Sequence, residues 1–409
     1  MEREIVLQPD FQIGQLQVES APMERVIEFL SARENTINEF HIKNNKRRFD
    51  SAENIAVLMG PRRGIGDAVM ELKPTIAAAQ ARPDKNFYVA APSFFLTSSR
   101  LDMPDNVHLD DGLPDLFKYD DTAFYMSYDP YKLAQFKLPH YLGQGSMAKK
   151  HIKKAVDTDR TCEVQVEHKL LADQIDTHLA KENPNHYYSL SQIQHTAFLH
   201  SLGIDLTQDS FSRSIYNQMD SVSGYNYDLL IAPDAQETSR SFISQGSTET
   251  KDGDKHLIKS FTREKWKEIF SLLPHDLEVG ILMGVSHPEY CQAVFSHALQ
   301  SGLTVTPVTT ETMDDFYNVV RSSNKYIGMD SGTTHIAADI VRSIPDTTDS
   351  PQVREIFNGT YVSQKYYGIA GIGNRGKILT NSRKEPTASS DLLSLDVIPS
   401  SRIARFIQS

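Results

Sequence analysis

Short apolar runs that alternate with helical patterns constrain this chain more than any other feature of its sequence. Runs of this length, apolar throughout, are typical of strands buried on both faces of a sheet. Strands that are separated by helices are typical of a parallel sheet. The pattern therefore predicts an α/β fold made of two Rossmann-like, doubly wound units. We expect strands at residues 54–60, 86–92 and 122–127 in the first unit and at 227–233, 278–284, 304–308 and 325–330 in the second.

Chain length and the position of these runs set the expected domains. At 409 residues the chain is too long for one ordinary core. We expect an N-terminal extension at residues 1–52, a first domain at 53–222 and a second at 223–409, whose final helix can pack back on the first. The sequence shows no long flexible linker between the domains, so we expect the two to face each other across a cleft.

Three local patterns predict details of the helices. Pro74, inside the helical stretch 67–83, predicts a kink or a break, because proline lacks the backbone donor of a helix interior. Gly203 predicts a helix end, in the position after the C-cap. A 3.6-residue period predicts one buried helix face, formed by Trp266, Ile269, Phe270 and Leu273.

Charge and composition exclude several classes of protein. The formal net charge of −11 argues against a nucleic-acid binder, whose contact surface would be basic. The basic stretches Lys43–Arg48 and Lys149–Lys154 are either solvated surface or sites of attraction to an anionic membrane surface or a phosphorylated acceptor. Cys162 and Cys291 are too few for a disulfide framework or a cysteine zinc site. No apolar run reaches membrane-spanning length, and we expect a cytoplasmic protein.

The stretch "KYIGMDSGTTHIAADIV" (325–341) carries the strongest chemical signal. In an open α/β sheet, ligands bind beyond the carboxyl ends of the strands, and Asp330 follows such an end. Gly332 allows a tight turn into a helix whose free N–H groups and dipole suit a pyrophosphate. We expect these outward N–H groups at Thr333, Thr334 and His335. Asp330 would then accept hydrogen bonds from sugar hydroxyls.

The same stretch has a simpler interpretation. Ser331 or Thr333 could be an ordinary N-cap, and His335 a surface residue. Composition alone favours this alternative.

A second strand-to-helix turn, "GPRRGIGDAVM" (60–70), places Asp67 at the start of a helix. Asp67 is either an N-cap or a general base that points between the domains. The glycines of this turn do not have the G-x-G-x-x-G spacing of a dinucleotide site, which disfavours a nicotinamide-dependent dehydrogenase. Lys259, before the amphipathic helix that begins near 263, is either solvated or placed to neutralise a leaving diphosphate.

These stretches together resemble the heptosyltransferase family of GT-B glycosyltransferases, which add ADP-heptose to lipopolysaccharide core. The family's late motif, Asp-(Ser/Thr)-Gly-x-x-His-(Leu/Ile)-x-Ala-Ala, is similar to "DSGTTHIAAD" (330–339). Its middle motif, Lys-x-Trp before a helix, is similar to "KSFTREKWKEI" with Phe261 in place of tryptophan. Its early motif is similar to "NIAVLMGPRRGIGDAVMELKP", and "FLHSLGI" and "LDVIPSSRIARFI" resemble the ends of its two domains.

The resemblance implies a role for each matching position. Asp67 would be the base that deprotonates the acceptor hydroxyl, and Lys259 would hold the donor phosphates, with Arg240 as the alternative phosphate ligand. Asp330 would contact the donor sugar, and Glu289 would lie near the nucleoside. The pyrophosphate would meet the rest of the late motif, Ser331, Gly332, Thr333, Thr334 and His335.

The chain departs from the family at a position beside the proposed donor and in two longer segments. Asp234 stands where the family has a glycine next to the phosphates, and a negative charge there is unfavourable unless its side chain points away. The loop 243–256 and the N-terminal extension are also atypical. These departures indicate a divergent member.

The resemblance thus implies an inverting, metal-independent glycosyltransferase of lipopolysaccharide biosynthesis, with no cofactor. Its donor would be a nucleoside diphosphate sugar, with ADP-heptose favoured, and its acceptor a saccharide or glycolipid. It would be cytoplasmic, with peripheral contact at the inner face of the membrane as a further expectation. The alternatives are a GT-B enzyme with a UDP-, GDP- or dTDP-sugar, and a catalytically silent protein that only binds nucleotide sugars.

Overall fold

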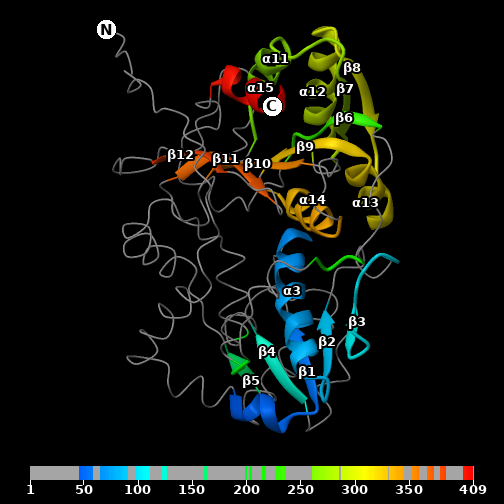
Figure 1. Ribbon diagram of the computed structural model, residues 1–409, viewed down its shortest axis with the longest axis vertical. Helices are drawn as coiled ribbons and strands as arrows, with labels where there is room; N and C mark the ends of the chain where they lie inside the picture. The colour runs from blue at the N-terminus through cyan, green and yellow to red at the C-terminus, as the bar shows by residue number, and fades with distance from the viewer. Residues whose placement is uncertain are drawn as a thin grey trace.

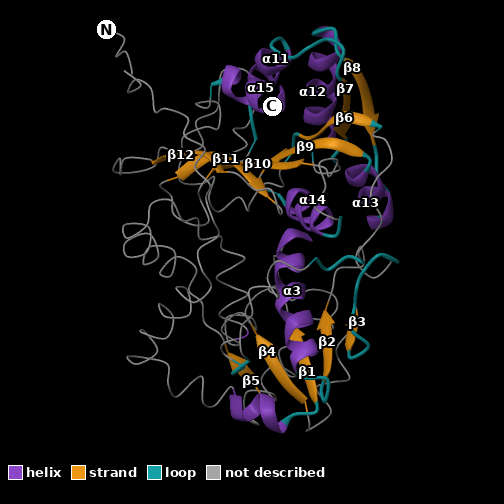
Figure 2. Ribbon diagram, viewed as in Figure 1, coloured by secondary structure: helices purple, strands orange, loops and turns teal. Residues whose placement is uncertain are grey.

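The computed structural model describes the following parts of the chain: residues 46–58, 65–90, 98–110, 122–126, 161–163, 199, 202–204, 214–217, 226–234, 260–284, 287–329, 331–344, 352–358, 366–372, 378–383 and 399–408. They form two sheets with helices packed against them (Figures 1 and 2).

The first sheet is parallel throughout its described strands. Its strands are β1 (Asn54–Leu58), β2 (Asn86–Ala90), β3 (Val107–Asp110), β4 (Thr122–Met126) and β5 (Thr161–Glu163). Their spatial order is β3-β2-β1-β4-β5, and each neighbouring pair is parallel. This order is that of a Rossmann sheet, in which the chain direction across the sheet reverses beside β1.

The second sheet repeats this arrangement and adds two strands. Its strands are β6 (Tyr227–Ala232), β7 (Glu278–Leu282), β8 (Thr304–Val308), β9 (Ser323–Met329), β10 (Gln352–Asn358), β11 (Tyr366–Ile372) and β12 (Ile378–Arg383). The five strands β8-β7-β6-β9-β10 are parallel and have the same order as the first sheet. The strands β11 and β12 continue the sheet in antiparallel fashion.

Along the chain, five of the named helices lie between these strands and α15 follows the last strand. The named helices are α3 (Ile65–Ala81), α11 (Arg263–Phe270), α12 (Pro288–Gln300), α13 (Met313–Arg321), α14 (Gly332–Arg342) and α15 (Ser400–Gln408).

The second sheet is covered by helices on both faces. Along β6, Leu229 and Ile231 belong to a core shared with α11, α12 and α15, because successive strand residues point to opposite faces. Their neighbours Leu230 and Ala232 belong to the other core, which α13 and α14 share with α3 of the first unit. This arrangement confirms the predicted α/β class with two Rossmann-like units.

All seven predicted strands are present, with ends that differ by at most two residues. The glycine turn at Gly203 is also confirmed: its φ is +66°, and the N–H of Ile204 donates to the carbonyl of Leu199 at 3.0 Å, as at a helix end. Of the kink or break predicted at Pro74, the break is wrong, because α3 continues through it to Ala81.

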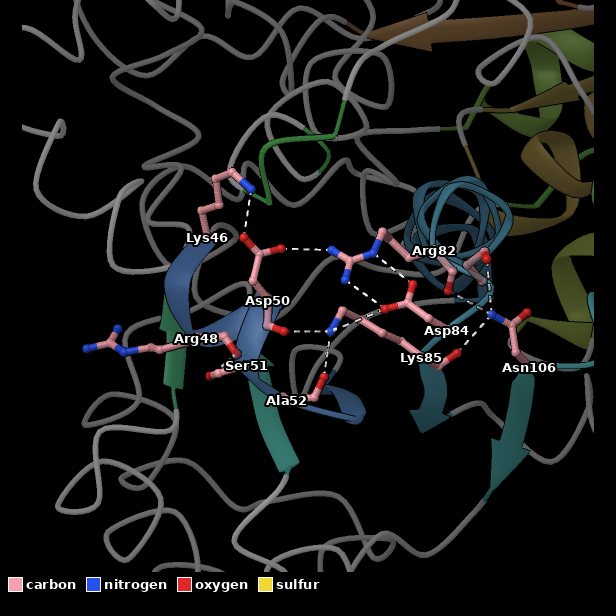
Figure 3. A network of polar contacts seen from close by, with 10 residues as sticks. Lys46, Arg48, Asp50, Ser51, Ala52, Arg82, Asp84, Lys85 and Asn106 are labelled. Atoms are coloured by element: carbon pink, nitrogen blue, oxygen red, sulfur yellow. Dashed lines mark hydrogen bonds and ion pairs between the residues drawn. The ribbon is translucent and has the colours of Figure 1, made fainter.

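Residues 46–52, which we assigned to the extension, pack on the first unit. They form a short helix at 46–51 whose Phe49 is fully buried against Phe87. Figure 3 shows the charged groups that hold this helix against the first unit. Arg82 donates to both Asp50 and Asp84, and the Nζ of Lys85 donates to the carbonyls of Asp50 and Ala52.

The final helix, α15, packs on the second unit. Its Ile403, Ala404 and Ile407 belong to the core of α11 and α12. Hydrogen bonds from Ser400 to Glu268 and from Lys325 to the carbonyl of Ile407 hold it there.

Candidate functional site

The second sheet has its topological switch point between β6 and β9. These strands are neighbours, although five named elements of the chain separate them. β6 ends at Ala232 and β9 at Met329, so the residues that follow each lie at the same carboxyl edge. Ligands of doubly wound folds bind at such an edge, next to the switch point. The late motif therefore begins at the position where this fold binds ligands.

The turn after β9 starts α14 at Gly332, with Ser331 as its N-cap residue in extended conformation. The Ser331 side chain accepts no capping hydrogen bond from the helix backbone. Its hydroxyl lies 2.9 Å from that of Thr333 and 3.4 Å from that of Thr334. The simple N-cap interpretation of Ser331 thus does not account for its hydroxyl, which lies with two others at the helix start.

Thr334 joins this helix start to the strand before it. Its hydroxyl is buried and donates to the carbonyl of Met329 at 2.6 Å. The strand residue Gly328 lies beneath it, and a Cβ at that position would come within 2.0 Å of the Thr334 Oγ1. The pair fixes the direction in which α14 leaves the sheet, and Thr334 has a structural role here.

The outward N–H groups lie one position earlier than the sequence predicted. Those of Thr334 and His335 donate to the carbonyl of Ser331, at 3.1 and 3.2 Å. Those of Gly332 and Thr333 make no hydrogen bond with any other described residue, as expected for the first turn of a helix. The prediction for Thr334 and His335 as backbone donors to a ligand is therefore wrong, and Gly332 and Thr333 remain suited to an anion.

Asp234 points toward a histidine. Its Oδ1 lies 2.6 Å from the Nδ1 of His287, and the Asp234 side chain is only 9% exposed. His287 comes after β7 and is the N-cap residue of α12, so this pair spans the ends of two neighbouring strands. The Asp234 carboxylate, which the sequence suggested would be unfavourable beside phosphates, therefore has His287 as a partner. Sequence reasoning missed His287, and the only signal for it was a histidine before the helix-starting Pro288.

Space around Asp234 is limited. A Cβ at Gly284 would come within 2.8 Å of its Oδ2. Nearby, Cys291 is fully buried, and burial, together with the Asp234 charge, raises the pKa of its thiol to about 11. Cys291 is therefore a core residue and not a nucleophile.

The other predicted site residues fall into two groups. Asp67 is the third residue of α3, in its first turn, so the N-cap interpretation is wrong and the general-base interpretation stays a prediction. Glu289 is exposed in the first turn of α12, two residues after His287. Lys259, Arg240 and Asp330 lie outside the described residues, although Lys259 directly precedes the buried Ser260.

Two further properties concern what the described segments could bind or cross. None of their acidic, histidine and cysteine side chains gather into a group of three or more that could hold a metal ion. Within the same segments, no helix has the length and apolar character needed to cross a membrane.

Among known proteins, this chain is similar to several solved structures. No protein-family model and no curated protein matches the chain. Among solved structures, Escherichia coli ADP-heptose lipopolysaccharide heptosyltransferase II is 16% identical over 87% of this chain and 97% of its own, with a TM-score of 0.45. A family 9 glycosyl transferase from Veillonella parvula is 11% identical over 86% and 95%, with a TM-score of 0.47. Escherichia coli heptosyltransferase WaaC with ADP is 14% identical over 76% and 93%, with a TM-score of 0.42. The solved structures similar to this chain thus include heptosyltransferases, the family that the motifs resemble.

Proposed function

We propose that this protein is a glycosyltransferase that moves a sugar from a nucleoside diphosphate donor to an acceptor hydroxyl, with inversion at the anomeric carbon. One observation carries the proposal. The motif "DSGTTHIAAD" begins at the switch point of the second sheet, and α14 starts there with the N–H groups of Gly332 and Thr333 unused by other described residues. A diphosphate is the ligand that such a helix start suits.

In this mechanism the second unit holds the donor. The amides of Gly332 and Thr333 and the hydroxyl of Ser331 bind the diphosphate, and Lys259 or Arg240 neutralises it as it leaves. Asp330 binds sugar hydroxyls, and Glu289 lies near the nucleoside. Fixed positive potential of this kind stabilises the departing charge without a metal. The loss of one such donor group costs about 2.7–4 kcal/mol of barrier in acyl-transfer enzymes.

The first unit supplies the base. The carboxylate of Asp67 takes the proton of the acceptor hydroxyl while its oxygen attacks the anomeric carbon and the bond to the diphosphate breaks. Asp67 lies in the first turn of α3, where the helix dipole favours its ionised form, the form that a base requires. The acceptor we favour is a saccharide or glycolipid, in keeping with the resemblance to enzymes of lipopolysaccharide biosynthesis.

The first experiment identifies the nucleobase of the donor. Thermal melting with ADP, UDP, GDP, dTDP and NADH ranks these ligands, because a ligand at 100 times its Kd stabilises a fold by about 2.7 kcal/mol. We expect ADP to raise Tm most, and ADP-heptose to be the donor. A larger effect of another nucleoside diphosphate would favour the alternative donors, and an effect of NADH alone would contradict the proposal.

Asp67→Asn separates an enzyme from a silent binding protein. We expect this variant to keep the nucleotide-induced rise in Tm and to lose transfer by roughly 10²–10⁴-fold, the usual contribution of a general base. Asp105→Asn, at an exposed aspartate of the same unit, is the matched control and should keep full turnover. Equal turnover of the two variants would contradict the role of Asp67.

A further inference from the structure

A buried ion pair joins the two units. The Nζ of Lys73 on α3 lies 2.6 Å from the Oδ1 of Asp339 on α14. The two side chains are only 6% and 1% exposed. Figure 1 shows the place where these helices meet, between the two sheets.

A third segment also binds Asp339. Its second carboxylate oxygen, Oδ2, accepts hydrogen bonds from the N–H of Ile215 at 2.7 Å and from the hydroxyl of Ser214 at 3.2 Å. The Ser214 hydroxyl lies 2.7 Å from the Asp339 carbonyl as well. One carboxylate therefore ties together α3, α14 and the segment 214–217 that precedes the second unit.

Lys73 and Asp339 lie at similar distances along their helices from the site residues proposed on each helix. Lys73 comes six residues after Asp67 on α3, and Asp339 comes seven residues after Gly332 on α14. At 1.5 Å per residue these separations are about 9 Å and about 10 Å along each helix. A small change in the angle between the helices at the ion pair would therefore displace Asp67 relative to the N–H groups of Gly332 and Thr333.

Stability alone does not explain such a pair. Desolvation of two buried charges offsets most of their attraction, and well-packed apolar residues often stabilise a fold as much or more. The surrounding core offers apolar neighbours, since Leu72, Ile76 and Ile340 are all buried in the same cluster. What the charged pair adds is a directional contact that permits one arrangement of the helices.

A second contact between the units is more exposed. Asp314, in the first turn of α13, accepts hydrogen bonds from the hydroxyls of Ser98 and Ser99, at 2.9 and 2.6 Å. Ser99 is exposed, so water can replace this contact at little cost. The contact between the units that water cannot readily replace is thus the buried one.

We propose that Lys73 and Asp339 are positioning residues that form a pivot, about which α3 and α14 keep Asp67 and the diphosphate-binding turn in register. The contact between Asp314 and the residues Ser98 and Ser99 limits rotation about it. The catalytic consequence rests on the proposed function, whereas the pivot itself rests on the contacts described above.

The test removes both charges together. Lys73→Met with Asp339→Asn removes both charges of the pair, keeps the approximate size of both side chains and keeps an acceptor for Ile215. Lys73→Arg keeps the charge, and Lys46→Met, which removes an exposed ion pair within the first unit, is the control.

Spin labels at Asp105→Cys and Gln300→Cys report the distance between the units, since both positions are exposed. Cys162 is replaced by serine, and buried Cys291, with its raised pKa, does not take the label. We expect one narrow distance distribution in the unsubstituted chain, in Lys46→Met and in Lys73→Arg, and a broad one in the double variant. An unchanged distribution in the double variant would overturn the proposal, and so would its failure to fold, which would make the pair a requirement of the fold.

Turnover gives the second readout. We expect kcat of the double variant to fall roughly 10²-fold with donor KM unchanged, because a displacement of about 1 Å between reacting groups costs this much. An equal loss in donor binding would indicate damage to the second unit and count against the pivot. If no nucleotide sugar is a substrate, the proposed function fails while the distance measurement still decides the pivot.

Discussion

The Nδ1 of His287 and the Oδ1 of Asp234 lie 2.6 Å apart, across the carboxyl ends of β7 and β6. The carboxylate is largely buried and the imidazole is 26% exposed. This contact fixes the imidazole ring, because the bonded Nδ1 determines how Nε2 is directed. Asp234, which stands where the resembled family has a glycine, is thus held in place by His287.

Removal of His287 should leave the Asp234 carboxylate buried without this partner. We expect His287→Leu to lower the free energy of unfolding by about 1–3 kcal/mol, the cost of one unsatisfied buried polar group. The double variant Asp234→Ala, His287→Leu removes that cost and should be more stable than His287→Leu alone. Urea unfolding measures both, and equal stabilities would show that the carboxylate does not need this partner.

Gly328 should not tolerate a side chain. A Cβ there would lie 2.0 Å from the Thr334 Oγ1 and 2.8 Å from the Tyr326 ring, so strand and helix would have to separate. We expect Gly328→Ala to lower the free energy of unfolding by about 1–3 kcal/mol, as overpacking does. Urea unfolding measures the loss. Addition of Thr334→Ala should restore part of it, and no recovery would mean that the Tyr326 contact alone accounts for the cost.

Cys291 should resist thiol reagents in the folded protein. Burial raises its pKa to about 11 from the ordinary 9.0, so almost no thiolate exists at pH 8. We expect iodoacetamide to modify Cys291 only after unfolding, as peptide mass spectrometry would show. Because the raised pKa favours the neutral thiol in the fold, its stabilising effect should be complete below pH 9 and decline as pH rises toward 11. Rapid modification of the native chain at pH 8 would contradict this.

The network of Figure 3 should lose its stabilising effect in acid. The hydrogen bond from Arg82 lowers the pKa of Asp84 to about 2 from 3.8. Stability from a lowered carboxyl pKa is present above the unfolded value and lost as pH falls through the folded value. We expect Arg82→Met to be less stable than the unsubstituted chain at pH 6 and the difference to shrink between pH 4 and pH 2, measured by urea unfolding. If the stability difference stays constant with pH, its cause is the lost contact with the Phe49 ring, over which Arg82 also lies at 5.1 Å.

The elements that sequence predicted well are those whose own residues determine them. The run at 54–60 and the turn at Gly203 carry local signals, since apolar composition indicates a buried strand and glycine permits positive φ. β3, β5, β10, β11 and β12 were missed. In β3 and β5 a strand of four or three mixed residues has no period to detect. The break expected at Pro74 was wrong because packing on both sides of the proline outweighs one lost hydrogen bond.

The candidate site was predictable to the same extent. The spacing of residues in the turn 331–335 indicates a diphosphate-binding turn. The partners of Asp234 and Asp339, in contrast, depend on contacts between distant segments. Asp339 lies within the run Ile336–Val341, whose other residues are apolar, and a buried charge of this kind indicates a partner without identifying it. Lys73 could be identified only once the fold brought it within 2.6 Å.

The separation of Lys73 and Asp339 by 266 positions also orders events during synthesis. A ribosome releases α3 long before α14 exists, so the nascent first sheet carries a lysine and apolar side chains that later become interior. Until the late motif emerges, that surface must stay hydrated or be shielded by a chaperone. A chain cut between the two sheets would then yield an amino-terminal piece prone to aggregate, and the halves would regain solubility only when produced together.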